Sequence, residues 1–475
     1  MLLVHPVNEV IRFFPALIAA FLIGSSSGEG GWWHVAAVAV PVLIGVARFL
    51  TTRFRITATQ LELRRGLLSR NVLTAPLDRV RTVELTSSPI HRLLGLSRVE
   101  IGTGSASNPG SDKLRLDSLP RAEARALRSA LIHNVGHAAA TDAAVDDVLL
   151  LLDPAWVRYA PLTTSGVVIA AAGLGAASQF VEPAINRLES SSVSLPAVPL
   201  GVTVVAALLA FALISSVLAI IGYVVANWGF TVSRDRGGRS IHVSRGLLTT
   251  RETSLDSERV RGVEVHEPLG LRLAGAARAT AIATGLRRRD DNSAALVPPA
   301  PRAVVDRVGG LVLGEADPFS APLTAHGPVA RRRRFTRALA GAAVLAAGVV
   351  ALVEALDASR WIDLSAIVAV VAAVPLAADR YRRLGHGLVG GWFVTRRHTL
   401  RGRRDALATD GIIGWSLGQS WFQRRAGLTN LTATTSAGKQ AYGVHDVPES
   451  AALTLIRAAD PGLVEPFLAP VRSAS

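Results

Sequence analysis

The chain has 475 residues, of which 49% are hydrophobic and 5% aromatic, and its formal net charge is +15. This length is enough for about three ordinary domains. The absence of cysteine excludes disulfides, thiolate metal sites and cysteine nucleophiles. The low aromatic content argues against the stacking platforms that bind single-stranded nucleic acid. The basic charge therefore points to an anionic membrane surface or to the loops of a membrane protein.

Six apolar stretches are predicted to cross a membrane, because a helix needs about 20 mainly apolar residues to span the bilayer core. They occupy residues 10–24, 33–50, 163–182, 199–226, 337–356 and 361–378. Short loops group them into three hairpins. A signal peptide is the alternative for the first stretch, but Glu9 lies where such a peptide carries positive charge.

The longer segments between the hairpins carry most of the basic residues. Residues 51–134 contain 14 Lys and Arg against 7 Asp and Glu. An arginine run, Arg331 to Arg334, precedes the fifth stretch. The positive-inside rule then predicts that both termini and the long segments lie in the cytoplasm. Only two of the 51 basic residues are lysines, and this bias, typical of GC-rich bacterial genomes, makes a bacterial inner (plasma) membrane the expected location.

Two phrases recur in these segments and indicate an internal repeat. The stretches "RGLLSRNVLTAPLDRVRTVE", from Arg65, and "RGLLTTRETSLDSERVRGVE", from Arg245, share RGLL and RVR-x-VE at one spacing. A second phrase places an arginine three residues before a glycine, at Arg92, Arg272 and Arg424. The chain is therefore predicted to contain three repeats, each a hairpin plus a polar segment, with the third repeat degenerate.

The polar segments are predicted to be β-rich, because "FRITATQLELRRGLLSRNVL" alternates apolar and polar residues around a turn at Arg65-Gly66. The stretches "RVRTVEL" and "RVEIGTG" predict further strands. Each polar segment ends in an apolar-periodic stretch that predicts a helix, at residues 121–132, 301–313 and 449–459. Several strands and one terminal helix favour a small barrel or sandwich with a helix across one end.

The stretches "ITATQLELRRGLLSR", "LDRVRTVEL" and "HRLLGLSRVEIGTG" make the chain resemble the bacterial pleckstrin-homology (PH) domain membrane proteins, whose long members have three tandem copies. The resemblance implies a multi-pass α-helical membrane protein with three cytoplasmic all-β domains, each a PH-like barrel with a C-terminal helix. It also implies a shorter one-copy membrane relative as partner and no established enzymatic activity. The expected boundaries are a hairpin at 1–50, domain 1 at 51–134, a linker at 135–162, a hairpin at 163–226, domain 2 at 227–315, a basic linker at 316–336, a hairpin at 337–378 and domain 3 at 379–470.

The arginines of the first phrase are candidates for binding anionic lipid headgroups, because a guanidinium can bond phosphate bidentately. They are Arg64, Arg65, Arg70, Arg79, Arg81, Arg245, Arg251, Arg259 and Arg261. The alternative is that they are solvated strand residues paired with acids such as Glu84. For the arginines of the second phrase, a structural turn role is favoured over anion binding, since a glycine follows each at fixed spacing.

No motif supports catalysis, a cofactor or a metal ion. The stretch "GSSSG" at 24–28 fits a nucleophile-elbow pattern, but it lies in a short loop between apolar stretches. The histidines show no ligand spacing, and His91 and His266 are interpreted as surface or turn residues.

The sequence thus predicts a non-enzymatic membrane scaffold or accessory protein in envelope or lipid homeostasis, whose PH-like domains bind protein partners or anionic headgroups. The alternative is a transporter or channel-like component for a lipid or peptide. Nucleic-acid binding is disfavoured, because many of the basic residues lie next to the apolar stretches.

Overall fold

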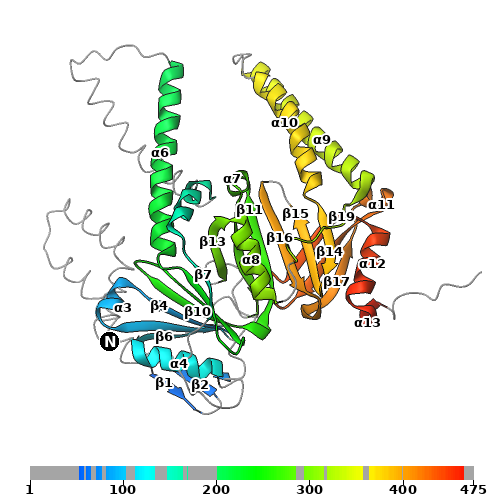
Figure 1. Cartoon of the computed structure of the whole chain (residues 1–475). Helices are drawn as coiled ribbons and strands as arrows, with labels where there is room; N and C mark the ends of the chain where they lie inside the picture. The colour runs from blue at the N-terminus through cyan, green and yellow to red at the C-terminus, as the bar shows by residue number, and fades with distance from the viewer. Residues whose placement is uncertain are drawn as a thin grey trace, which may run out of the picture. The chain divides into compact units, whose positions relative to one another are not determined.

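The chain divides into two compact units, Met1–Leu151 with Val225–Arg259 and Leu152–Val224 with Val260–Ser475. Both contain antiparallel sheets (Figure 1). The computed structural model describes residues 53–57, 60–65, 71–76, 82–102, 113–133, 147–163, 168, 200–284, 294–314, 318–356, 363–397 and 400–464. The predicted spans at 10–24 and 33–50, the stretch at 24–28 and nearly all of the span at 163–182 lie outside these residues.

Each repeat contains three strands, three more strands with a short helix after the first of them, and a terminal helix. Repeat 1 consists of β1 (Arg53–Ile56), β2 (Gln60–Arg65), β3 (Asn71–Pro76), β4 (Thr82–Ser87), α3 (Pro89–Leu93), β5 (Leu96–Gly102), β6 (Lys113–Pro120) and α4 (Arg121–His133). Repeat 2 consists of β8 (Thr231–Arg234), β9 (Ser240–Arg245), β10 (Thr250–Asp256), β11 (Val260–Pro268), α7 (Leu269–Leu273), β12 (Ala276–Ala283), β13 (Ala295–Pro301) and α8 (Arg302–Leu313). Repeat 3 consists of β14 (Gly385–Val389), β15 (Trp392–Arg397), β16 (Arg401–Ala408), β17 (Ile412–Gly418), α11 (Trp421–Arg425), β18 (Leu428–Thr435), β19 (Ala441–Pro448) and α12 (Glu449–Ala459).

The predicted terminal helices are confirmed by α4, α8 and α12, and the predicted turn in the RGLL phrase is confirmed in repeat 2. There β9 ends at Arg245 and Gly246 adopts φ +109°. A side chain at Gly246 would meet the Thr249 carbonyl oxygen at 2.1 Å, so only glycine fits this turn. The RVR-x-VE phrase of repeat 2 leads into strand β11, as predicted.

The three repeats share strand registers. Repeat 2 follows repeat 1 by 180 residues, as Arg245 follows Arg65, and repeat 3 follows repeat 2 by 152 residues, as Gly427 follows Gly275. After these offsets, the pairs β2–β3, β9–β10 and β15–β16 have one register. The degenerate sequence of repeat 3 therefore keeps the backbone pairing of the others.

The sheets are not confined to single repeats. In the first unit, β4 of repeat 1 pairs with β10 of repeat 2 in a seven-stranded sheet of order β6-β5-β4-β10-β9-β8-β7. In the second unit, β11 of repeat 2 pairs with β16 of repeat 3 in a six-stranded sheet of order β13-β12-β11-β16-β15-β14. Separate barrels were predicted, whereas consecutive repeats share a continuous sheet.

In repeats 1 and 3, apolar side chains of the last three strands (β4–β6 and β17–β19) pack under the terminal helix. In repeat 1, Val99 and Ile101 of β5 are fully buried against Ala124 of α4. In repeat 3, Leu431 of β18 and Val444 of β19 are fully buried in a cluster that includes α12. Burying each Leu, Ile or Val side chain of this kind contributes about 1.5–3 kcal/mol, so these faces determine where the terminal helices dock.

Three helices among the described residues are long and apolar enough to cross a membrane. They are α6 (Leu200–Asn227), α9 (Gly327–Ala355) and α10 (Asp363–Arg382). They correspond to the predicted fourth, fifth and sixth spans. Helix α9 begins at Gly327 rather than at residue 337, so the arginine run expected in a linker is helical.

Other differences from the predictions concern shorter features. The expected linker at 135–162 contains strand β7 (Asp147–Leu151), which pairs with β8, and the 3-10 helix η2 (Pro154–Leu162). Shorter elements are η3 (Ser257–Arg259), η5 (Thr409–Gly411) and α13 (Pro461–Val464). The surface assignment of His91 and His266 is wrong, because both are buried, with 2% and 9% of their surface exposed.

Candidate functional site

Most of the predicted headgroup arginines of repeat 1 lie outside the part of the chain that the structure describes. Arg70, Arg79 and Arg81 lie outside the described residues. Arg64 and Arg65 are the last two residues of strand β2.

Two arginines of repeat 2 lie together on the sheet of the first unit. Arg245 on β9 and Arg251 on β10 are register partners, so their side chains project from the same face. Burial and the neighbouring charge of Arg251 lower the pKa of Arg245 to about 10, while Glu84 acts in the opposite direction. The Arg245 guanidinium remains charged at neutral pH, and the two residues form a basic pair.

The other two predicted arginines of repeat 2 are engaged in ion pairs. Arg259 Nε lies 3.0 Å from Asp256 Oδ2. Arg261 Nη1 lies 2.9 Å from Asp410 Oδ2, and the Asp410 side chain is 74% exposed. These contacts agree with the interpretation as strand residues paired with acids. Arg245 and Arg251 are the two described arginines of the first phrase that lie opposite each other on neighbouring strands.

Two arginines of the second phrase, Arg92 and Arg272, connect their repeat to the segment that follows it. Arg92 of α3 donates from Nη1 to the Leu247 carbonyl in the RGLL turn of repeat 2, at 2.6 Å. Arg272 of α7 pairs with Asp379 in helix α10, at 3.0 Å. The turn itself depends on the glycine, which has φ of +65° at Gly95 and similar values in the other repeats. The turn prediction is confirmed for the glycines, whereas Arg92 and Arg272 extend to the next repeat.

The short helices also expose large apolar side chains. Leu93 of α3 is 88% exposed and Leu273 of α7 is 79% exposed. In α11, Trp421 and Phe422 are 59% and 68% exposed, and the Arg425 guanidinium lies 5.0 Å from the Trp421 ring centroid. Exposed apolar tips in all three repeats suggest contact with an apolar phase.

Each of these tips adjoins the end of an apolar helix. Leu247, which Arg92 contacts, donates its N–H to the Val225 carbonyl in the last turn of α6, at 2.9 Å. Arg272 reaches α10 through Asp379. Ser420, the N-cap of α11, accepts a hydrogen bond from Arg333 of α9 at 3.4 Å. The tips thus lie where the apolar helices meet the sheets.

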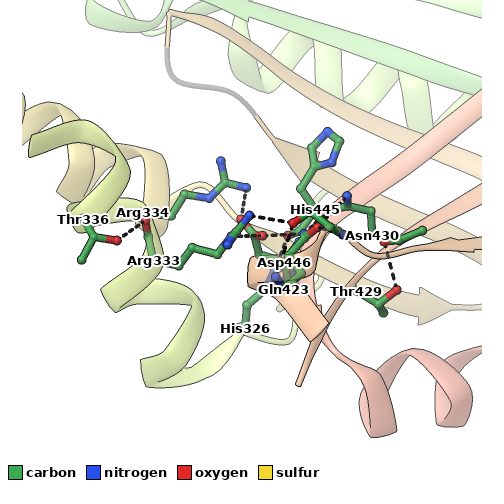
Figure 2. A network of polar contacts seen from close by, with 11 residues as sticks. His326, Arg333, Arg334, Thr336, Gln423, Thr429, Asn430, His445 and Asp446 are labelled. Carbon is green, nitrogen blue, oxygen red and sulfur yellow. Dashed lines mark hydrogen bonds and ion pairs between the residues drawn. The ribbon is translucent and has the colours of Figure 1, made fainter. Parts of the chain in front are cut away.

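A buried polar network joins α9 to repeat 3 (Figure 2). At its centre is Asp446 of β19, whose side chain is 1% exposed. Its carboxylate lies 2.9 Å from Arg333 Nε and 2.8 Å from Arg334 Nη2. Gln423 of α11 donates to it at 2.8 Å, and Asn430 accepts the Asp446 N–H at 3.2 Å. Asp446 has φ +57°, a left-handed conformation that Asp and Asn tolerate better than most residues.

This network attaches the basic end of α9 to the β17-β18-β19 sheet of repeat 3. Two guanidinium groups compensate one buried carboxylate, and Gln423 and Asn430 supply further polar partners. Such a cluster is stable only while its partners are all present, because a single buried charge is costly. The arginine run therefore has a structural contact in addition to any role in membrane orientation.

Two buried histidines lie beside this network. His326 Nδ1 donates to the carbonyls of His445 and Asp446, at 3.0 and 3.1 Å. His386 Nδ1 donates to His326 Nε2 at 3.0 Å, which requires that His326 Nε2 carry no proton. Burial is the main cause that lowers the pKa of His326 to about 4, and burial also lowers the pKa of His386.

Acidification below pH 6.5 is expected to destabilise the second unit through His326. The unfolded chain takes up a proton near pH 6.5, whereas the folded chain resists protonation until about pH 4, so stability falls as pH decreases. The loss between pH 7 and pH 5 should reach roughly 2 kcal/mol for this group. Thermal melts of the full chain in detergent at pH 7 and pH 5 would measure it.

The control for this pH effect is His326→Asn, because an Asn side-chain nitrogen can replace Nδ1 as donor without titrating. The variant should lose less stability than the parent on acidification. An equal loss in both proteins would contradict the assignment to His326.

A second buried cluster lies at the junction of repeats 2 and 3. Glu264 of β11, with its side chain 4% exposed, lies 2.7 Å from both Arg403 Nε and Lys439 Nζ. Its register partner on β16 is Asp405, which is fully buried and lies 3.2 Å from Arg397. Burial and the Glu264 charge raise the pKa of Asp405. The junction therefore holds two acids opposite each other, surrounded by cations.

Sequence reasoning missed both clusters. Asp446 and Gln423 follow no catalytic or ligand spacing, and the arginine run was interpreted only as a signal of membrane orientation. The one available signal was that Glu264 belongs to the recurring RVR-x-VE phrase. Its strand was predicted, but its partner strand in the next repeat was not.

The comparisons with known proteins agree with the repeat structure. A family model described as the bacterial PH domain matches residues 12–135 and 173–307, more than half of the chain. No curated protein and no solved structure gives a significant match. The matched segments cover repeats 1 and 2, and the registers extend the same architecture to repeat 3.

Proposed function

Because this chain belongs to the bacterial PH domain family, we propose that it is a non-enzymatic membrane scaffold whose PH-like repeats are held against the cytoplasmic membrane surface. Three apolar helices and the bacterial PH family support association with a membrane. The repeats would bind anionic headgroups or protein partners, such as a shorter one-copy relative, in envelope or lipid homeostasis.

The observation that carries this proposal is the position of the apolar tips. Leu93, Leu273 and Phe422 are exposed in three equivalent short helices, each linked to the end of an apolar helix. Exposed apolar and aromatic side chains beside arginines are suited to the membrane interface, where acyl chains meet charged headgroups. The Asp446 network would hold the α11 tip at that level.

Charge supports placing the repeats in the cytoplasm. Arg331 to Arg334 lie in the first turns of α9, and Arg380 and Arg382 lie in the last turn of α10. Both helices of this hairpin thus carry basic residues at the end that adjoins the sheets. Basic residues flanking a span favour the cytoplasmic side, so both chain termini would also be cytoplasmic.

The transporter alternative gains no specific support from the apolar helices that are described. A transport path requires polar groups directed into the membrane interior. In α6, Ser215 and Ser216 donate to the Phe211 and Ala212 carbonyls of their own helix, at 2.6 and 2.7 Å. We therefore favour the scaffold.

The proposal predicts that the α11 tip enters the membrane interface. The chain has no cysteine, so the variant Phe422→Cys can carry a single spin label. In proteoliposomes with anionic lipid, the label at residue 422 should be more accessible to oxygen than to a water-soluble nickel complex, because oxygen concentrates in acyl chains. Power-saturation electron paramagnetic resonance measures both accessibilities.

A matched control is Arg457→Cys in the last turn of α12, a helix that runs from the side of α11 toward α13 (Figure 1). Its label should report an aqueous environment. If the label at residue 422 is as accessible to nickel as the one at residue 457, the membrane-facing arrangement is wrong. Repeating the measurement in neutral lipid shows whether anionic headgroups contribute.

A further inference from the structure

The two junctions between repeats use one register. In the first junction, Leu255 of β10 is opposite Thr82 of β4. In the second junction, Leu407 of β16 is opposite Gly262 of β11. Leu255 and Leu407 are equivalent after the 152-residue offset, and Thr82 and Gly262 are equivalent after the 180-residue offset. The third strand of one repeat therefore pairs in a fixed way with the fourth strand of the preceding repeat.

Strand β17 is the equivalent of β4 and β11, and among the described strands no third strand of another repeat pairs with it. Within the described part of the chain, its hydrogen-bonded neighbour is β18 alone. The side chains at one equivalent position of the three strands differ in exposure accordingly. Leu85 of β4 is 4% exposed and Val265 of β11 is buried completely, whereas the equivalent Leu417 of β17 is 43% exposed. One edge of β17 is thus open at the position where the first two repeats continue.

Strand β3 is the complementary open edge at the other end of the series. It is equivalent to β10 and β16, and among the described strands it pairs only with β2. Val72 of β3 is 54% exposed. Its equivalents, Glu252 and Arg404, are opposite Leu85 and Val265 in the two junctions. The described strands of repeats 1 and 3 therefore present the two complementary halves of the junction.

The composition of both edges permits pairing. Open strand edges are usually protected from association by charged residues or by proline within the strand. The sequence of β17, IIGWSLG, contains neither, and β3, NVLTAP, contains no charge and has its proline at the last position. Ile413 and Leu417 of β17 are exposed large apolar residues.

We propose that β17 of one molecule pairs with β3 of a second molecule of this chain, which continues the internal junction head to tail. A second molecule is the occupant because the chain itself presents both complementary edges, and the two internal junctions show how such edges pair. Transferring their register gives the expected pairs Asn71–Gly418, Val72–Leu417, Leu73–Ser416, Thr74–Trp415 and Ala75–Gly414.

The test uses site-directed cysteine crosslinking, which is unambiguous because the chain has no native cysteine. Two differently tagged full-length chains, one with Val72→Cys and one with Leu417→Cys, are coexpressed and oxidised in isolated membranes. A disulfide-linked dimer carrying both tags is expected, since opposed residues in an antiparallel pair have Cα atoms about 4.5–5.5 Å apart, within the range of roughly 4.4–6.8 Å that a disulfide spans.

The register control replaces Leu417→Cys with Ile413→Cys, which lies on the same strand and is also exposed. Four residues of displacement along a strand is about 13 Å, so this pair should crosslink about tenfold less. Equal crosslinking of both pairs would overturn the proposal. A crosslink only to a different protein would also overturn it. A third variant carries both Val72→Cys and Leu417→Cys in one chain, and a disulfide within that single molecule would contradict pairing between two molecules.

A second substitution tests the β17 edge at a position that carries no cysteine. Gly262 of β11 has no room for a side chain, because a Cβ there would meet the Ala406 carbonyl oxygen of β16 at 2.1 Å. At the equivalent Gly414 of β17, no atom lies within 4 Å, and both strands have a register shift at this glycine. Gly414→Val should leave the melting temperature of the detergent-solubilised single molecule unchanged. The same substitution should reduce the Val72→Cys/Leu417→Cys crosslink about tenfold. An undiminished crosslink in this variant would contradict the proposed register.

Discussion

Replacing Asp446 with alanine is expected to lower the free energy of unfolding of the second unit by about 3–5 kcal/mol. The substitution leaves the partly buried Arg333 and Arg334 guanidinium groups without the carboxylate that lies 2.9 and 2.8 Å from them. Alanine also fits poorly at φ +57°. Thermal unfolding of the full chain in detergent measures the loss, and protease sensitivity of repeat 3 reports whether it detaches from α9.

The variant Asp446→Asn separates charge from backbone strain, because asparagine tolerates the left-handed conformation. Asp446→Asn should retain the backbone geometry, and its free energy of unfolding should still fall by most of the amount expected for the alanine variant. The matched control is Asp410→Asn, which removes an ion pair whose carboxylate is 74% exposed and should change stability by less than about 0.5 kcal/mol. Similar losses at residues 446 and 410 would show that the buried network does not hold α9 to repeat 3.

Replacing Glu264 with glutamine is expected to weaken the junction of repeats 2 and 3 by about 3 kcal/mol, because it removes the buried carboxylate that compensates two partly buried cations. Arg403 and Lys439 both lie 2.7 Å from this side chain. The same melting experiment measures the effect. The exposed Glu258→Gln serves as control, and a loss of equal size there would contradict the assignment.

The Glu264→Gln variant also has a pH signature. Burial and the Glu264 charge raise the pKa of Asp405 to about 6 in the folded chain. The folded chain therefore holds a proton that the unfolded chain has already released, and the parent protein loses stability as pH rises toward 6. The variant lacks the Glu264 charge, which is one cause of the raised pKa of Asp405. Its free energy of unfolding should therefore fall less as pH rises toward 6. This comparison separates an electrostatic role of Glu264 from a role in packing alone.

Much of the secondary structure could be predicted from the sequence, because its signals are local. The alternation around Arg65-Gly66 indicated a hairpin, and the apolar period indicated the terminal helices. Gly246 could be placed in a turn because few other residues accept φ +109°. The helical start of α9 was missed, because an arginine run has no apolar period and resembles a linker.

The candidate sites were predicted less well, because they depend on contacts between residues far apart in the chain. The arginines of the basic phrase were candidates for headgroup binding, with strand residues paired to acids as the alternative. The structure instead places Arg259 and Arg261 in separate ion pairs and brings only Arg245 and Arg251 together among the described arginines of that phrase. Asp446 meets Arg333 across 113 residues, a separation at which sequence spacing gives no information about contact.

The sequence by itself determined the three repeats, the offset of 180 residues between Arg65 and Arg245, several strands and a turn of repeat 1, and the terminal helix of each repeat. These features follow from side-chain periodicity and from backbone preferences that act over a few residues. Only the tertiary structure decided that β4 pairs with β10 and β11 with β16, so that consecutive repeats share sheets and two edges stay open. The reason is physical: a strand has two hydrogen-bonding edges with the same backbone groups, and only long-range packing determines which partner each edge receives.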